Sequence, residues 1–157
     1  MIGSGRSALF WPAVLSALIG GAPVAACPLG LAVVRVADGV ELARVDAASF
    51  TLEWRHSVTL TMVRDVYVLS PEGRIRQVEE RFAAHGPGMA HDGAGWRRED
   101  GEFVLPLDRP LDRLILRAAP EHRNRLRAGG ADIDLTLWSG QPLELKPVPC
   151  PLQEPAP

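Results

Sequence analysis

The stretch Phe50-Thr51-Leu52-Glu53-Trp54-Arg55-His56-Ser57-Val58 decides the fold, because apolar and polar side chains alternate along it. Alternation with a period of two is typical of a strand that buries one face. The buried face would carry Phe50, Leu52, Trp54 and Val58, and His56 falls in register with them. A histidine on an apolar face needs a hydrogen-bonding partner, so His56 is the most unusual residue of the stretch.

Further strands are predicted on both sides of this stretch. They cover residues 31–37, 40–45, 63–69, 74–82, 102–106, 113–118, 132–138 and 142–146. Asp38-Gly39 between the first two is a hairpin signal, because a type I′ turn needs positive φ. Pro106 requires an edge or a strand end at that point. In 132–138, Ile133, Leu135 and Leu137 are expected to face inward.

About nine short strands joined by close turns, with no convincing helix, predict an all-β fold. The expected architecture is a small antiparallel β-sandwich or an open barrel. A chain of 157 residues suits one domain. We place that domain at 27–146, with a long irregular segment at 84–101 and a basic loop at 119–130, followed by a proline-rich tail at 147–157. The net charge of −2 argues against a nucleic-acid partner.

Residues 1–26 are predicted to be a signal peptide or a membrane anchor. A single cation, Arg6, precedes the uncharged run 8–26, and small residues lead up to Cys27. The run is about as long as a membrane span, ~20 residues, although prolines and glycines interrupt it. Both alternatives predict an exported protein that is periplasmic or attached to the outer face of the inner membrane.

The two cysteines, Cys27 and Cys150, leave three alternatives open. An exported protein can keep a disulfide, and this one would close nearly the whole domain. Alternatively, Val24-Ala25-Ala26-Cys27 looks like a bacterial lipobox, which would make Cys27 a lipid anchor. The third alternative is two free thiols.

No catalytic, metal or cofactor site is predicted. His56 and Ser57 would point to opposite faces of a strand, so the serine could not be activated by the histidine. His85, His91 and Asp92, with His56 or His122 as a remote ligand, do not show a recognised metal-ligand spacing. Gly86-Pro87-Gly88 lacks the context of a phosphate loop, and we expect its glycines to let Met89 turn inward.

Carboxylate pairs give little further information. Asp65 and Glu79 could be drawn as a glycosidase-like pair, but a chain with 19 acidic residues offers many such pairs. Solvated strand faces, or one buried pair of Glu79 with Arg81, are the simpler interpretation.

Three motifs together resemble the bacterial DUF1850 family. They are Phe50-Thr51-Leu52-x-Trp54-x-His56-Ser57-Val58, then Val78-Glu79-x-Arg81-Phe82-x-x-x-Gly86-x-Gly88-Met89, then Pro106-Leu107-x-x-Pro110-Leu111-x-x-Leu114-x-Leu116-Arg117. The resemblance covers about residues 31–118. It implies a small exported protein of no assigned activity, typically encoded beside the receptor and fused permease of a TAXI-type TRAP transporter. The chain departs from the family pattern at Thr59, where a Glu is usual, and at Val63-Arg64-Asp65, which replaces a Trp-Glu-Glu-like patch.

The leading hypothesis is a non-enzymatic accessory protein that binds the TAXI-type permease, its solute receptor, or both. We expect His56, Glu79 and Arg81 to form a buried polar cluster that supports a contact loop at 86–89. The candidate partner- or ligand-binding residues are His56, Ser57, Asp65, Glu79, Arg81, Gly86, Gly88 and Met89. One alternative is a small-ligand or lipid-binding module with a closed apolar pocket between its sheets. Another is a hydrolase that uses His56 with a carboxylate.

Overall fold

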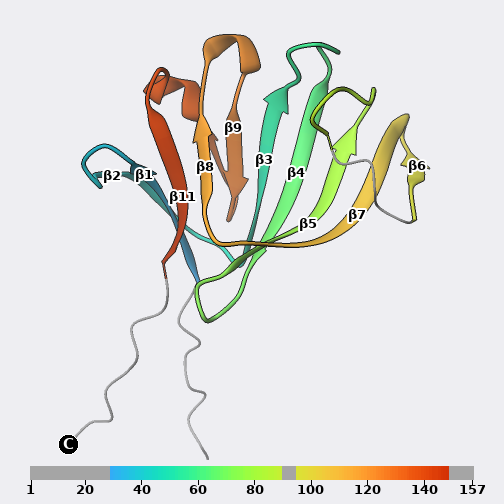
Figure 1. The fold of residues 1–157 in the computed structure, drawn as a ribbon. Coiled ribbons are helices and arrows are strands. Elements are labelled where there is room, and N and C mark those ends of the chain that lie inside the picture. Colours follow the sequence, from blue (N-terminus) through green and yellow to red (C-terminus); the bar gives the residue numbers. More distant parts are fainter. Residues whose placement is uncertain (1–28, 90–94, 149–157) are drawn as a thin grey trace, which may run out of the picture.

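Two antiparallel sheets make up the described part of the chain, which is residues 29–89 and 95–148 of a computed structural model (Figure 1). The smaller sheet has the order β2-β1-β11-β8 and the larger the order β10-β9-β3-β4-β5-β7-β6. The small sheet contains β1 (Gly30–Arg35), β2 (Glu41–Asp46), β8 (Leu114–Arg117) and β11 (Pro142–Val148). The large sheet contains β3 (Ser49–Arg55), β4 (Met62–Leu69), β5 (Ile75–Phe82), β6 (Arg97–Glu99), β7 (Glu102–Leu111), β9 (Arg125–Ala128) and β10 (Ala131–Asp134).

The predicted all-β class is confirmed, and the sheets do not close into a barrel. Two short 3₁₀ helices, η1 (Pro120–His122) and η2 (Leu135–Trp138), are the helical elements of the described residues. Within residues 29–89 and 95–148, no helix is long and apolar enough to cross a membrane. The predicted signal or anchor at 1–26, Cys27 and Cys150 lie outside the described residues.

The main core lies between the two sheets. Leu31 and Val33 of β1 and Leu143 and Leu145 of β11 enter it from the small sheet. From the large sheet it receives Phe50, Leu52, Tyr67, Leu69, Ile75 and Leu126. Phe50 and Tyr67 stack with their ring centroids 4.8 Å apart. These strands therefore bury the alternating apolar face that their sequences predict.

A second, smaller core lies toward the β7 side of the large sheet. Val63 of β4, Phe82 of β5 and Leu105 of β7 are fully buried there. Met89, which is 5% exposed, packs on them from the loop that follows β5. We call residues 83–89 the covering loop. The prediction that Met89 turns inward is thus confirmed.

The β3 stretch ends earlier than its alternation predicts. β3 stops at Arg55, and His56 begins the loop to β4. His56 is buried as predicted, at 3% exposure, but Val58 is 66% exposed, so its placement on the buried face was wrong. The chain turns after His56, which breaks the period of two.

The predicted basic loop at 119–130 is also wrong, because it contains η1 and β9. Leu126 of β9 is fully buried and pairs with Leu52 of β3. Arg125 and Arg127 flank it on the opposite face, so the segment alternates like the other strands. Four residues are too few for that alternation to stand out in the sequence.

The predicted strand at 132–138 changes into a helix halfway. Asp134 ends β10, and its Oδ1 accepts hydrogen bonds from the Thr136 amide at 2.9 Å and the Thr136 hydroxyl at 2.6 Å. This capping starts η2. Leu135 is buried as predicted, whereas Leu137 is 75% exposed and does not face inward.

Two strands run further than predicted. β7 continues to Leu111, and β6 pairs only with its first residues, up to Val104. Pro106 therefore lies on an edge among the described residues, where the sequence required one, and it opposes Glu79 at an irregularity in the β5–β7 pairing. β11 continues to Val148, two residues into the predicted tail, and its Pro147 pairs with Leu31.

Candidate functional site

The loop between β3 and β4 is ordered by its own hydrogen bonds. The His56 amide donates to the Thr61 carbonyl at 2.8 Å, and the Leu60 amide donates to the His56 carbonyl at 2.9 Å. The hydroxyls of Thr59 and Thr61 lie 2.9 Å apart. The Arg55 Nε donates to the Leu60 carbonyl at 3.2 Å. The loop is therefore a fixed turn rather than a continuation of the strand.

The His56 ring is fully engaged by main chain. Its Nδ1 accepts from the amides of Val58 at 3.1 Å and Thr59 at 3.2 Å, so that nitrogen carries no proton. Its Nε2 lies 3.1 Å from the Pro87 carbonyl. A carbonyl only accepts, so Nε2 bears the hydrogen and donates it. The geometry thus requires the neutral ring with its proton on Nε2.

Gly86 allows this ring to lie against the covering loop. A methyl group at position 86 would come within 2.6 Å of His56 Cε1 and 3.0 Å of Thr59 Cγ2. The Gly86 amide donates to the Met89 sulfur at 3.1 Å, and the Met89 amide donates to the Gly86 carbonyl at 3.3 Å. We call His56, with its bonds to Val58, Thr59 and Pro87 and its contact with Gly86, the histidine clasp.

A second buried polar group lies beside the clasp on the inner face of the large sheet. Asp65 of β4 accepts hydrogen bonds from the Trp54 indole at 2.9 Å and from the Gln77 amide at 3.0 Å. Burial raises the pKa of Asp65, and those two hydrogen bonds together with the charge of Arg109 oppose the rise. The centroid of the Trp54 ring lies 5.5 Å from that of the His56 ring, so Trp54 is a neighbour of both polar groups.

Glu79 and Arg81 are not part of the clasp, which corrects the predicted cluster. Arg81 pairs with Glu79 at 2.5 Å and with Glu99 at 3.3 Å. Arg97 of β6 also reaches Glu79, at 2.9 Å. These pairs lie on the outer, solvent-facing side of the large sheet, because strand neighbours alternate between faces and Phe82 faces inward. They tie the short edge strand β6 to β5.

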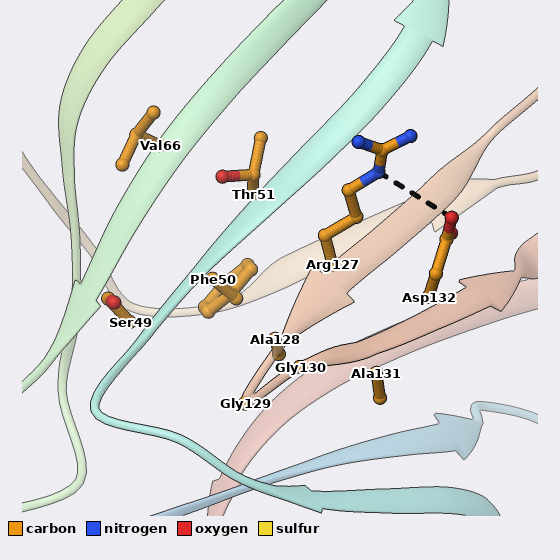
Figure 2. Close-up of a pocket in the computed structure, with 10 residues that line it drawn as sticks. All are labelled: Ser49, Phe50, Thr51, Val66, Arg127, Ala128, Gly129, Gly130, Ala131 and Asp132. Carbon is orange, nitrogen blue, oxygen red and sulfur yellow. Dashed lines mark ion pairs between the residues drawn. The ribbon is translucent and has the colours of Figure 1, made fainter.

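Two open depressions lie on the outer face of the large sheet. One, of about 500 Å³, is lined mainly by β3, β9 and β10, and Figure 2 shows Arg127 pointing toward Asp132 across it. The other, of about 580 Å³, shares Thr51, Val66 and Arg127 with the first. Its cations are already paired, since Arg127 lies 3.3 Å from Glu53 and Arg64 pairs with Glu102. The charges on this face neutralise one another, which argues against an anion-binding site.

The structure brings together some of the predicted site residues and separates others. His56, Gly86 and Met89 meet in the clasp and the second core, with Ser57 and Gly88 exposed beside them. Asp65 lies on the inner face and Glu79 and Arg81 on the outer, so the two carboxylates do not form a catalytic pair. Ser57 is exposed while His56 is buried, as the predicted separation of their side chains requires.

The three histidines of the described residues do not converge on a metal site. His85 packs against Phe82, and His122 Nδ1 lies 3.2 Å from the Arg55 carbonyl. His91 and Asp92 fall outside the described residues. In the described part of the chain, no group of three or more His, Cys, Asp or Glu side chains is arranged to hold a metal ion.

Two sets of contacts at the site were missed by sequence reasoning. The acceptors and donors around His56 are main-chain groups of Val58, Thr59 and Pro87, and no side-chain pattern reports them. The bond between Trp54 and Asp65 joins β3 to β4 diagonally across the hairpin, because Trp54 pairs with Val63 and Asp65 pairs with Leu52. A hairpin register counted outward from the turn would have indicated that contact.

One family model matches the chain. It is described as "Domain of unknown function (DUF1850)" and it matches residues 50–135. The matched range holds nearly all of the large sheet and every residue of the clasp, whereas β1, β2 and β11 of the small sheet lie outside it. No curated protein and no solved structure matches the chain significantly.

Proposed function

Because the chain belongs to the DUF1850 family, we propose that it is an exported accessory protein of a TAXI-type TRAP uptake system. In this proposal it binds the permease, the solute receptor, or both, and catalyses no reaction. The choice of transporter rests on the gene neighbourhood that the family resemblance implies. The choice of binding over catalysis rests on the site itself.

The state of His56 is the observation that carries the non-catalytic assignment. A general base needs a free lone pair within reach of a substrate proton. The Nδ1 lone pair already accepts two amide hydrogens, and Nε2 donates to Pro87. The ring is also only 3% exposed. These contacts favour a structural role for His56 and count against the hydrolase alternative.

The packing between the sheets counts against the small-ligand alternative, which needs a sizeable closed apolar pocket. Leu31, Leu126, Leu143 and Leu145 meet there with no exposed surface. The two depressions of about 500 and 580 Å³ are open to solvent and carry ion pairs. A protein surface is the remaining kind of partner that this fold suits.

The arrangement of the chain ends fits attachment of the N-terminal segment to a membrane. Gly30 pairs with Val148, so the described chain enters and leaves at the same end of the molecule (Figure 1). The β3–β4 loop, η1 and η2 lie at the opposite end. An anchored N-terminus would therefore present those loops away from the membrane.

The test is a binding and uptake experiment with the transporter encoded beside the gene. Full-length protein should co-purify with the permease or the solute receptor, and deletion of the gene should lower solute uptake. Wild type and the Glu72→Gln control should both restore uptake, because Glu72 lies in an exposed turn away from the clasp. Uptake that is unchanged by the deletion, together with no binding to either component, would refute the proposal.

A further inference from the structure

Three apolar side chains are exposed on one short loop. In the β3–β4 loop and at the start of β4, Val58 is 66% exposed, Leu60 58% and Met62 37%. Single exposed apolar residues are common on protein surfaces. Here three of them come at alternate positions of one short segment, Val58 and Leu60 in the loop and Met62 at the start of β4, and clustered exposed apolar residues mark contact sites.

The backbone at Leu60 makes its exposure harder to explain by folding alone. Its φ is +56°, a left-handed conformation that Gly or Asn adopts far more readily than leucine. A glycine there would remove both the strain and the exposed apolar surface. Strain that is kept at an exposed position points to a use for that side chain.

The patch is held rigidly before any partner arrives. The histidine clasp fixes the amides of Val58 and Thr59, and the Leu60 amide is bonded to the His56 carbonyl. Ordering a loop on binding costs conformational entropy, so a pre-ordered loop binds more tightly. The clasp therefore orders the loop that carries the exposed apolar side chains, in addition to holding the covering loop over the second core.

Two cations border the patch. Arg55 donates to the Leu60 carbonyl, and His122 Nδ1 lies 3.2 Å from the Arg55 carbonyl, which places η1 beside the loop. Arg123, which caps η1, is exposed and also has a left-handed φ, of +49°. Arg123 and Met62 line one open depression of about 350 Å³, together with Pro120, Arg125, Asp134 and Thr136. Among the ion pairs of the described residues, none includes Arg55 or Arg123.

The geometry points to a docking surface for a protein segment that carries apolar side chains beside a carboxylate. We define this tip surface by Arg55, Val58, Leu60, Met62, Pro120 and Arg123. The inference rests on the proposed function, because the tip surface would be the contact with the transporter component. The unpaired cations supply the charge complementarity for a carboxylate, and the apolar residues supply the buried centre of the contact.

A lipid surface is the rival occupant, and the tip surface fits it less well. Two cations attract an anionic membrane only weakly, and stable attachment usually needs a larger basic cluster or a second anchor. Glu121 of η1 and Asp134, which lines the same depression as Arg123, limit the positive charge of this end of the molecule. An extended anionic surface would meet these acids as well as the cations, whereas a single carboxylate can lie beside Arg55 or Arg123 alone. The tip surface also lies at the end opposite to the one where the described chain begins and ends (Figure 1).

The test is a random-peptide selection against the immobilised full chain, followed by affinity measurements on variants. Leu60→Gly and Arg123→Gly remove one side chain each and relieve its left-handed strain, so both variants should remain folded. Selected peptides should combine apolar residues with Asp or Glu, and each variant should weaken their binding at least tenfold. The matched control is Ile115→Ser, an exposed apolar residue of β8 that is 44% exposed and should leave binding unchanged.

Two results would overturn the docking surface. One is peptide binding that Leu60→Gly leaves intact. The other is binding of the full chain to phosphatidylcholine–phosphatidylglycerol vesicles that Leu60→Gly abolishes, which would assign the tip surface to lipid.

Pull-down with the transporter components separates this inference from the proposed function. If a component binds wild type and Leu60→Gly equally, only the docking surface fails. If no component binds wild type while the selected peptides require Leu60 and Arg123, only the assignment to the transporter fails.

Discussion

The two halves of the large sheet bury their inner faces under different covers. The half around β3 and β9 lies under the small sheet, where Leu143 and Leu145 of β11 meet Leu52 and Leu126. The other half, around Val63, Phe82 and Leu105, is packed by Met89 of the covering loop. One cover is regular secondary structure and the other is irregular chain.

The difference shows what an irregular cover needs. A strand satisfies its amides and carbonyls in the sheet ladder, as β11 does between β1 and β8. A loop has no ladder, so its polar main-chain groups need other partners. His56 supplies one for the Pro87 carbonyl of the covering loop, and its other ring nitrogen accepts from the amides of Val58 and Thr59 in the β3–β4 loop. The polar His56 side chain therefore supplies main-chain hydrogen bonds that a neighbouring strand would supply in a sheet.

The largest expected effect breaks the regular cover. Leu143 is fully buried between the sheets, so Leu143→Ala should lower the free energy of unfolding by about 2–5 kcal/mol. Met89→Ala should cost toward the lower end of that range, because the covering loop can move into the space left behind. Urea denaturation followed by tryptophan fluorescence measures both. A Met89→Ala loss larger than that of Leu143→Ala would show that the two covers do not differ in this way.

The next prediction concerns the close approach of Gly86 to the His56 ring, which holds the irregular cover in place. Gly86→Ala puts a methyl group 2.6 Å from His56 Cε1, so it should cost about 1–3 kcal/mol through displacement of the ring. In a His56→Ala background the contact with the ring is gone and the tight contact with Thr59 Cγ2, at 3.0 Å, remains, so the cost should fall below about 1 kcal/mol. The double-mutant cycle in urea measures the coupling.

Ala83, which is exposed in the same loop, provides the control for that cycle. Ala83→Ser should cost little in either background. Additive losses for Gly86→Ala and His56→Ala would mean that the glycine is needed for some reason other than the histidine.

The regular half was largely predictable from the sequence, because period-two alternation reports a strand under a flat cover. The strands around Leu31, Leu52 and Leu143 were all placed within a few residues of their observed bounds. β9 was missed because its four residues are too short a sample of the pattern. Leu137 was misplaced because a side chain of its own segment, Asp134, caps η2 and overrides the alternation.

The irregular half was only partly predictable. The sequence marks His56 as unusual and Gly86 and Met89 as special, and the structure brings those three together. It does not report that the partners of His56 are main-chain atoms, since every residue type has an amide and a carbonyl. Glu79 was wrongly assigned to the cluster, because alternation counted from the buried Phe82 already places Glu79 and Arg81 on the outer face.

The third prediction distinguishes the hydrogen bonds at the His56 Nδ1 from the hydrogen bond at its Nε2. In His56→Asn, the side-chain oxygen can still accept from the amides of Val58 and Thr59, as in an Asx turn, but it cannot reach the Pro87 carbonyl. The loss should be about 1 kcal/mol, the net value of one hydrogen bond. In hydrogen exchange, the Met89 amide should lose protection while the Val58 and Thr59 amides keep theirs. Faster exchange in β1 or β11 would mean that the clasp supports the whole fold.

The smallest expected effect concerns Asp65, which lies where the two halves meet. Its partner Trp54 packs against both cores. Burial raises the pKa of Asp65 in the fold, so the folded protein holds this proton more tightly than the unfolded chain does. The stability contributed by the protonated form is present below the ordinary Asp pKa, about 3.9, and is lost as pH rises from there through the raised value.

Asp65→Asn keeps an acceptor for the Trp54 indole but cannot ionise. Wild type should lose stability between pH 3 and pH 7 as Asp65 ionises, and Asp65→Asn should not. The free energy of unfolding of Asp65→Asn minus that of wild type should therefore rise over this range. Asp108→Asn is the control, because the exposed Asp108 carboxylate is paired with Arg76 on the surface and should not reproduce that rise. Urea titrations of the three proteins at several pH values measure the slope. If the Asp65→Asn difference is flat or falls with pH, the charge of Asp65 is not opposed by burial, and the boundary between the two cores tolerates a carboxylate as well as the surface does.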